Sequence, residues 1–302
     1  MAKTIPIFRA ASGINNKIDP VRLAFDPETG VTEFAAAVNV DIDRTGRPSR
    51  RKGYARALTG AWHSLFNNGG AFALGVSGAG LYAIHPDYSK ELIAAVTAGL
   101  KVSYVRIADQ VFWANGKEKG IIANLRNAPW VAGEYIGPET TKTFYDPPAG
   151  HLLEVYAGRM YVAKENIVWA SRPFAYGQFD LARDWVPFAG RIRMMRAVSA
   201  GLFVSDDREI VFLAGSGPKD FIPRRVASYP ALEGTDVRVE AEKLGLDAAG
   251  EAIVFTSTGG ICLGGSDGFF KNLTEERLAL PAGISRGAAG IVNGRYIVTI
   301  EP

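Results

Sequence analysis

One short pattern recurs along the chain and limits the folds open to it. An apolar segment meets a turn of small residues, and a second apolar segment follows, often with an aromatic residue early in it. The copies cover residues 73–84, 104–113, 153–162, 195–204, 244–255 and, in a shorter form, 289–298. These segments lack the 3.6-residue apolar spacing of amphipathic helices, so each copy predicts a β-hairpin.

The copies return at an interval that suits the blade of a β-propeller. The equivalent positions are Tyr82, Phe112, Tyr161, Phe203, Val254 and Ile297. Their successive separations are 30, 49, 42, 51 and 43 residues, with a mean of 43. Three copies carry a third strand, at residues 167–171, 210–213 and 260–264. A blade of about 40–50 residues and four strands fits this period, and a ring of blades protects strand edges that separate hairpins would expose.

We therefore predict an all-β protein with a single β-propeller domain of about six blades over residues 1–302. The last copy has two strands before the sequence ends, so its blade needs strands from elsewhere. Residues 37–54 indicate a hairpin, with a turn at 44–47. We expect this closing hairpin to pair with the C-terminal strand and complete the ring, with residues 1–36 as an N-terminal extension. The 34 glycines and 16 prolines agree with many turns and short strands.

The remaining segments are less regular. Asp19 followed by Pro20 indicates the start of a short helical turn, with Asp19 as the N-cap. One or two further helical turns are expected within residues 89–98, and residues 134–149 indicate a Pro-rich loop between blades.

The sequence offers little for catalysis. The three histidines lack the spacing of metal ligands, and the single cysteine, Cys262, lies in an apolar run that predicts a buried, inert thiol. The candidate glycosidase carboxylates are Asp206, Asp207, Asp267, Glu275 and Glu276, but turns and helix ends are the commoner places for the pairs Asp206-Asp207 and Glu275-Glu276. We expect no enzymatic activity, no metal and no cofactor. No apolar run approaches about 18 residues, so we also expect no membrane contact.

One basic cluster stands out, although the net charge is only +3. It consists of Arg44, Arg47, Arg50, Arg51 and Lys52, with Arg56 just beyond. Along a strand, Arg50 and Lys52 face one side and Arg51 the other, so both faces cannot be buried without partners. Three interpretations stay open: a solvated hairpin, a docking edge for an acidic protein neighbour, and a surface near DNA phosphates. A second basic group that could extend this surface comprises Arg191, Arg193, Arg196, Lys219, Arg224 and Arg225.

Several segments together resemble one known family. They are residues 15–20, 39–54, 158–163, 168–173, 177–180, 201–205 and 271–277. These phrases, such as the one from Asn39 to Tyr54, resemble the β-propeller virion proteins of tailed bacteriophages, which include tail hub, nozzle and packaged-DNA stabilisation components. The resemblance covers most of the chain and consists of short sequences expected to form hairpins, with no catalytic signature. The chain is shorter than the nozzle relatives and lacks their inserted domains.

The resemblance implies a structural role in a virion that is assembled in the bacterial host cytoplasm. The expected partners are other virion proteins of the tail, adaptor or portal side, in several symmetric copies, with DNA nearby at most incidentally. Two alternatives stay open. One is a carbohydrate-binding or glycan-cleaving propeller that engages the host surface, and the other is a free cytoplasmic scaffold.

Overall fold

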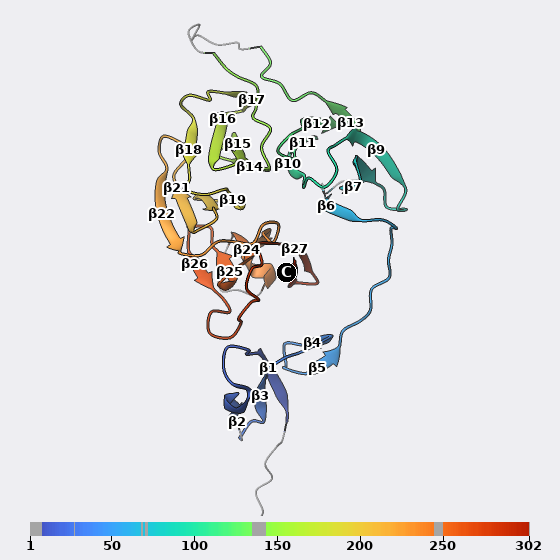
Figure 1. The fold of residues 1–302 in the computed structure, drawn as a ribbon, viewed down its shortest axis with the longest axis vertical. Coiled ribbons are helices and arrows are strands. Elements are labelled where there is room, and N and C mark those ends of the chain that lie inside the picture. The colour runs from blue at the N-terminus through green and yellow to red at the C-terminus, as the bar shows by residue number, and fades with distance from the viewer. Residues whose placement is uncertain are drawn as a thin grey trace, which may run out of the picture.

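The computed structural model describes residues 8–26, 28–67, 69, 72–134, 143–244 and 250–301, without the side chains of Lys243 and Leu244. The protein is all-β, with 51% of its residues in strands and 2% in helices. Five antiparallel sheets of four or more strands follow one another around an arc, and a two-stranded sheet comes last (Figure 1). The predicted all-β class is therefore confirmed, and the succession of sheets is propeller-like.

The strands of the large sheets run in chain order. The first sheet contains β6 (Trp62–Asn67), β7 (Ala73–Ser77), β8 (Gly80–Ile84) and β9 (Lys90–Ala95). The second contains β10 (Ser103–Ile107), β11 (Gln110–Ala114), β12 (Lys119–Ala123) and β13 (Arg126–Ala128). The third contains β14 (Leu152–Tyr156), β15 (Arg159–Lys164), β16 (Ile167–Arg172) and β17 (Ala175–Phe179), and β18 (Trp185–Pro187) also pairs with β16. The fourth contains β19 (Met194–Val198), β20 (Gly201–Ser205), β21 (Ile210–Ala214) and β22 (Ile222–Ala227). The fifth contains β23 (Val237–Glu240), β24 (Glu251–Ser257), β25 (Gly260–Gly264) and β26 (Phe270–Asn272).

Smaller elements lie at the two ends of the chain. The last sheet pairs β27 (Arg286–Val292) with β28 (Arg295–Glu301). An N-terminal sheet has the order β1 (Ala10–Ile14), β3 (Val31–Phe34) and β2 (Phe25–Asp26). The hairpin of β4 (Val40–Ile42) and β5 (Pro48–Arg50) forms a two-stranded sheet by itself. The 3-10 helices are η1 (Pro20–Arg22), capped by Asp19 as predicted, and η2 (Ala241–Leu244).

The large sheets stack face to face, and their cores lie between them. All five residues of β20 are buried. Leu202 and Val204 pack in a cluster shared with the third sheet, whereas Phe203 packs in a cluster shared with the fifth. Because alternate residues of a strand point to opposite faces, β20 contributes to two cores at once. Consecutive sheets are therefore bound to each other by hydrophobic packing along the whole arc.

Three serine hydroxyls add polar contacts between neighbouring sheets. Ser64 Oγ accepts the Val102 N–H at 2.9 Å, and Ser103 Oγ accepts the Leu153 N–H at 2.9 Å. Ser205 Oγ accepts the Ala231 N–H, also at 2.9 Å. Each hydroxyl accepts a backbone N–H near the point where the chain enters the next sheet. At these positions no neighbouring strand supplies a carbonyl acceptor for that N–H.

The predicted hairpins agree with the structure except in three places. The segment 244–247 was expected to be a strand, but Leu244 ends η2, the rest lies outside the described residues, and the strand is β23. The helical turns expected at 89–98 are wrong, because residues 90–95 form β9 against β8. Tyr82 lies on the third strand of its sheet, whereas Phe112 lies on the second, which accounts for the short first interval of the repeat.

The N-terminal region is more structured than an extension, since residues 10–34 contain the β1–β3–β2 sheet. The closing hairpin forms, with β4 and β5 paired as predicted. Among the described residues, however, it and the β27–β28 pair remain separate sheets, and no backbone pairing joins them. The strand pairing of the described residues therefore does not itself close the ring.

Candidate functional site

The predicted basic cluster lies on the β4–β5 hairpin and on the residues directly after it. Asp43 shapes the turn, because its Oδ1 accepts the N–H groups of Thr45 at 2.8 Å and Arg47 at 3.0 Å. The Thr45 hydroxyl, followed by the Arg47 N–H, lowers the pKa of the Asp43 carboxyl. Gly46 has a φ of +81°, and a Cβ there would lie 2.7 Å from the Cβ of Ala10. The turn is therefore a defined structure packed against β1.

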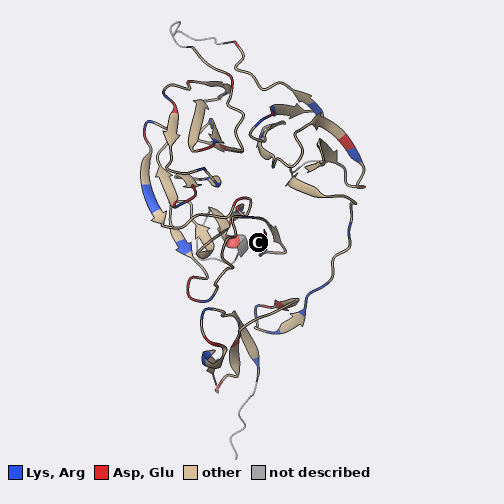
Figure 2. Ribbon diagram, viewed as in Figure 1, with Lys and Arg blue, Asp and Glu red and all other residues tan. Residues whose placement is uncertain are grey.

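All five predicted docking residues are exposed: Arg44, Arg47, Arg50, Arg51 and Lys52. The guanidinium of Arg51 pairs with Asp41 Oδ1 at 3.3 Å. No ion pair is present for the other four within the described part of the chain. Figure 2 shows the basic positions following one another along the hairpin and the segment after it. The hairpin thus carries five closely spaced cations, of which Arg51 forms an ion pair.

Apolar side chains that the sequence analysis did not single out flank these cations. Val38 is 81% exposed and Tyr54 is 80% exposed. Two shallow hollows of about 450 and 240 Å³ lie beside the hairpin. Their lining residues are Val38, Asn39, Val40, Pro48, Ser49, Arg50, Arg51, Lys52, Gly53 and Tyr54. The sequence signal for this surface was the presence of apolar residues, Val38 and Tyr54, at the two ends of the basic cluster. We call Val38, Tyr54 and the five cations the basic hairpin surface.

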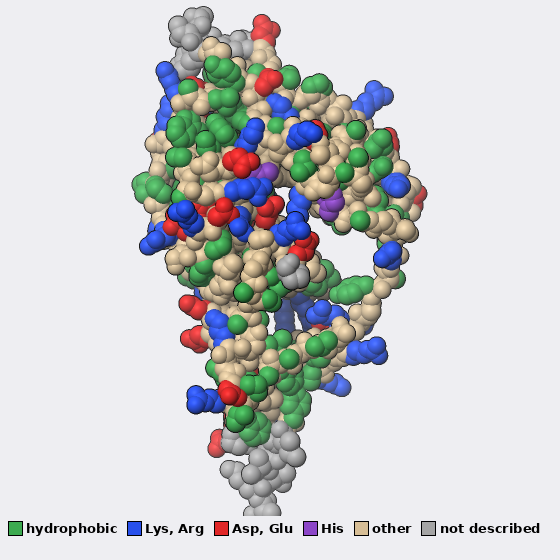
Figure 3. Space-filling model, in the orientation of Figure 1, with side chains coloured by type: hydrophobic (Ala, Val, Ile, Leu, Met, Phe, Trp, Pro, Cys, Tyr) green, Lys and Arg blue, Asp and Glu red, His purple; other side chains and the backbone are tan. Residues whose placement is uncertain are grey.

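The basic hairpin surface stands away from the stacked sheets. Residues 51–61 link it to β6 without helix or strand, and in Figure 3 this link is separated from the body by an opening. The N-terminal sheet has a firmer contact with the body. The Asn16 amide donates to Ala279 O at 2.9 Å and accepts the Ala279 N–H at 2.7 Å, and Arg277 lies 3.7 Å from the buried Glu33.

The second basic group does not extend this surface. Its members lie on or next to the fourth sheet, where neighbouring groups bind the side chains of most of its arginines. Arg191 pairs with Glu233 at 3.0 Å, Arg193 with Asp207, and Arg225 with Glu209 at 3.8 Å. Arg224 lies over the Phe212 ring and donates to the Gly268 carbonyl. These arginines therefore join strands and sheets to one another.

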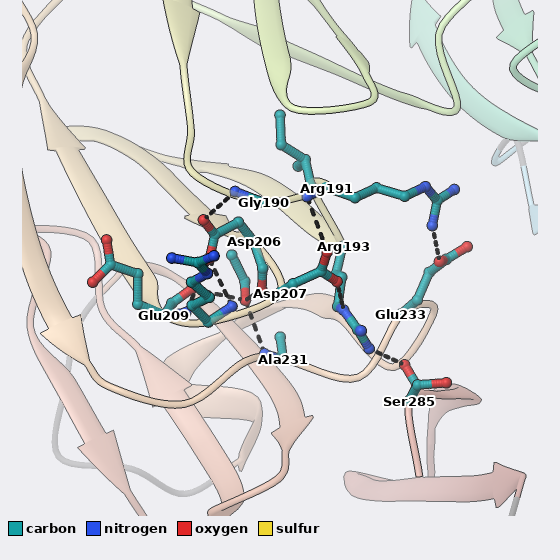
Figure 4. A network of polar contacts seen from close by, with 12 residues as sticks. Gly190, Arg191, Arg193, Asp206, Asp207, Glu209, Ala231, Glu233 and Ser285 are labelled. Carbon is teal, nitrogen blue, oxygen red and sulfur yellow. Dashed lines mark hydrogen bonds and ion pairs between the residues drawn. The ribbon is translucent and has the colours of Figure 1, made fainter. Parts of the chain in front are cut away.

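Figure 4 shows what the pair Asp206-Asp207 does at the β20–β21 turn. Asp206 is buried and accepts the N–H groups of Gly190 at 3.0 Å, Arg208 at 2.8 Å and Glu209 at 2.9 Å. Asp207 accepts the Arg191 N–H at 3.0 Å and the Arg193 side chain. Both carboxylates bind the segment that leads into β19 to this turn, which is a structural role.

A second polar network, which the sequence analysis missed, crosses the inner strands of three sheets. Glu154 on β14 is buried and accepts hydrogen bonds from Arg196 on β19 at 3.4 Å and Arg238 on β23 at 3.1 Å. Arg196 also pairs with Asp236. These carboxylates, Asp236 first, raise the pKa of the Arg196 guanidinium, so its charge is permanent. Arg196 and Arg238 are 42 and 84 residues away from Glu154 in sequence, and no local sequence pattern indicates these contacts.

Chemically reactive arrangements are sparse in the described ranges. No group of three or more His, Cys, Asp or Glu residues there has the geometry to hold a metal ion. Cys262 is fully buried, as predicted, and burial raises its pKa to about 11. None of the helices in that part of the chain has the length and hydrophobicity required to cross a membrane.

Comparisons with known proteins support the fold alone. No protein-family model matches the sequence, and no curated protein matches it significantly. The structure is similar to the extracellular domain of BT4673 from B. thetaiotaomicron, with a TM-score of 0.52 and 12% identity over 82% of this chain. This chain spans 31% of that domain. It is also similar to BBS1N, solved in complex with ARL6DN, with a TM-score of 0.51 and 11% identity over 87% of this chain and 84% of the other.

A gluconolactonase from Xanthomonas campestris matches 76% of this chain and 79% of its own length, at 15% identity and a TM-score of 0.46, which carries no inference about activity. The similar structures are propeller-like proteins. By its strands and by these similarities, the chain has an all-β, propeller-like fold.

Proposed function

We propose that this chain is a structural, non-enzymatic component of a tailed-phage virion, in the tail or in the connection between head and tail. It would assemble, in several symmetric copies, through protein–protein contacts. The observation that carries the proposal is the basic hairpin surface, where four cations without an ion pair and two exposed apolar side chains lie together. Mixed apolar and arginine-rich patches of this kind are favoured at protein interfaces.

The partner that fits this surface best is an acidic region of another virion protein. Carboxylates of the partner would accept charge-assisted hydrogen bonds from the arginines, and an apolar side chain would cover Val38 or Tyr54. DNA phosphates match the charge but leave both apolar side chains uncovered. A protein neighbour therefore accounts for more of the surface.

We further propose that the propeller has six blades and that the β4–β5 hairpin completes the last one. The first five sheets each have at least four strands, and the last has two. In the chain, the β4–β5 hairpin lies before the link to β6, which is the inner strand of the first large sheet. In the same way, the outer strands of each large sheet lie before the inner strand of the next one. An ion pair of 3.7 Å between Asp41 on β4 and Arg295 on β28 supports this proposal. Pairing of β28 with β4 would satisfy the free edges of both.

Charge reversal tests the docking role. The double variant Arg50→Glu/Arg51→Glu is expected to fold, because both side chains are exposed and the lost Arg51–Asp41 ion pair should cost at most about 1 kcal/mol, but to be missing from purified particles. A matched control is Arg126→Glu/Lys271→Glu, which reverses two exposed cations on β13 and β26. The control should assemble normally.

Mass spectrometry of purified particles tests the location itself. Absence of the wild-type chain from particles would overturn the virion role, whereas its presence together with normal assembly of the Arg50→Glu/Arg51→Glu variant would show the hairpin to be plain solvated surface.

Truncation after Ile291 tests the closure, since loss of β28 should lower the melting temperature. An unchanged melting temperature would contradict it.

A further inference from the structure

A small hollow at the junction of the third and fourth sheets has an unusual lining. Its volume is about 190 Å³. It lies where the ends of β15 and β16 meet the β17–β18 turn and the β21–β22 loop. The residues that line it are Phe144, Arg159, Arg172, Pro173, Asp180, Arg183, Asp184 and Lys219. Four cations thus share a small space with two carboxylates.

Two of the cations are held in place by the protein. Arg159 donates to Ser171 O at 2.7 Å and lies 3.8 Å from Asp184. Arg172 donates to Gln178 Oε1 at 3.1 Å, and its guanidinium lies 4.8 Å from the centre of the Phe144 ring. Both side chains are partly buried, so their positions are set before any ligand arrives.

The other two cations, Arg183 and Lys219, lie at the exposed rim. Neither has an ion pair among the described residues. The two carboxylates of the lining are already engaged, since Asp184 faces Arg159 and Asp180 accepts the Ala182 N–H at 3.2 Å. Even without Arg172, the three cations Arg159, Arg183 and Lys219 outnumber these two carboxylates, so the lining has an excess of positive charge.

The loop that carries Lys219 is fixed to the third sheet. The Tyr156 hydroxyl donates to Gly215 O at 2.7 Å, and Ser216 donates to Asp220 at 3.1 Å. Asp220, the neighbour of Lys219, is not part of the lining. These contacts hold the loop of the fourth sheet against the third sheet at the rim of the hollow.

We propose that this hollow binds a small oxyanion group of the phosphate or sulfate type. Guanidinium groups donate planar, bidentate hydrogen bonds to the oxygens of such anions, and Lys219 adds a positive point charge. The hollow is smaller than the roughly 300–1,000 Å³ of pockets that enclose drug-sized ligands, so it takes a free anion or the charged end of a small molecule. The site is separate from the basic hairpin surface, and it does not depend on the proposed virion role.

Titration of the full-length protein with inorganic phosphate, followed by calorimetry or by amide NMR shifts, tests the proposal. Saturable binding is expected, with shifts confined to residues of this lining and its two loops. Glucose 6-phosphate provides a second arm. Tighter binding than inorganic phosphate would assign the site to a phosphorylated small molecule, and equal binding would assign it to the free anion.

The variant Arg183→Gln/Lys219→Gln is expected to weaken phosphate binding about tenfold or more, because it removes the two rim charges. Both residues are exposed, so the fold should persist, and a thermal melt verifies this. The matched control Arg44→Gln/Arg47→Gln removes two charges from the hairpin and should bind as the wild type does. Absence of saturable binding at millimolar phosphate, or equal weakening by both variants, would overturn the proposal.

Discussion

The guanidinium Nη1 of Arg295, the first residue of β28, lies 3.7 Å from the carboxylate Oδ1 of Asp41 on β4. The same Oδ1 lies 3.3 Å from Arg51 Nε. One carboxylate therefore connects the last sheet, the first hairpin and the basic hairpin surface. Because the two sheets come from opposite ends of the chain, this contact is where closure of the ring can be tested.

Reversal of this ion pair is expected to loosen the hairpin. Arg295→Asp and Asp41→Arg should each increase hydrogen exchange of residues 37–54, and the double variant should restore part of the protection. Both side chains are partly exposed, at 51% and 35%, so we expect a coupling of about 0.2–1 kcal/mol. The thermodynamic cycle of the four proteins measures it. Strictly additive effects would mean that the contact does not hold the two sheets together.

Removal of the Glu154 carboxylate should destabilise the protein by about 1–3 kcal/mol. Glu154→Ala leaves the Val155 N–H, at 2.9 Å from the carboxylate, and the Arg238 side chain without their acceptor. Urea denaturation gives the change. Glu301→Ala is the control, since it breaks an ion pair with Arg286 whose side chains are 61% and 56% exposed, and it should cost at most about 1 kcal/mol. Equal losses would show that the network across the three inner strands adds nothing.

The inter-sheet serines should matter more than exposed ones. Ser205→Ala removes the acceptor of the Ala231 N–H in a fully buried site, and we expect a loss of about 1–3 kcal/mol in the free energy of unfolding. Ser49→Ala, whose hydroxyl makes one exposed contact with Asp41 O at 3.4 Å, should change stability little. A Ser205→Ala variant as stable as Ser49→Ala would argue that water replaces the lost acceptor.

The sequence predicted the strands that are buried on two sides better than the others. In β20, apolar residues at successive positions serve two different cores, so the segment is apolar throughout and easy to recognise. β23, with the sequence Val-Arg-Val-Glu, was missed because its charged residues interrupt such a run. β9 was expected to be helical because Lys-Glu-Leu-Ile-Ala-Ala has a high helix propensity, which pairing with β8 overrides.

The charged residues were harder to interpret, since a sequence does not show which partner a side chain meets. The cations of the hairpin were recognised because they are close in sequence and remain exposed. Arg193 and Arg196 form an equally dense group, but Asp207 and Asp236 neutralise them from other strands. The lining of the hollow proposed to bind an oxyanion comes from five separate segments, so its positive charge becomes evident only when the sheets are stacked.

Cys262 should report on unfolding and should make stability sensitive to alkaline pH. Its thiol is fully buried, with Sγ 3.3 Å from Ser257 Oγ. Burial raises its pKa to about 11, whereas an unfolded cysteine has a pKa of about 8.5. The stability that the neutral thiol provides is therefore complete below the unfolded pKa and is lost as the pH rises towards the folded one.

We therefore expect the native protein to resist the thiol reagent DTNB at pH 8 and to react fully in denaturant. Between pH 8.5 and 10, the urea midpoint of the wild type should fall more steeply than that of Cys262→Ala. The comparison stops at pH 10 because burial also raises the pKa of Tyr229 and Tyr296, each to about 12, and these tyrosines contribute at higher pH in both proteins. Parallel pH profiles, or rapid labelling of the native protein, would contradict a buried neutral thiol, because only a group that titrates differently in the two states links proton binding to folding.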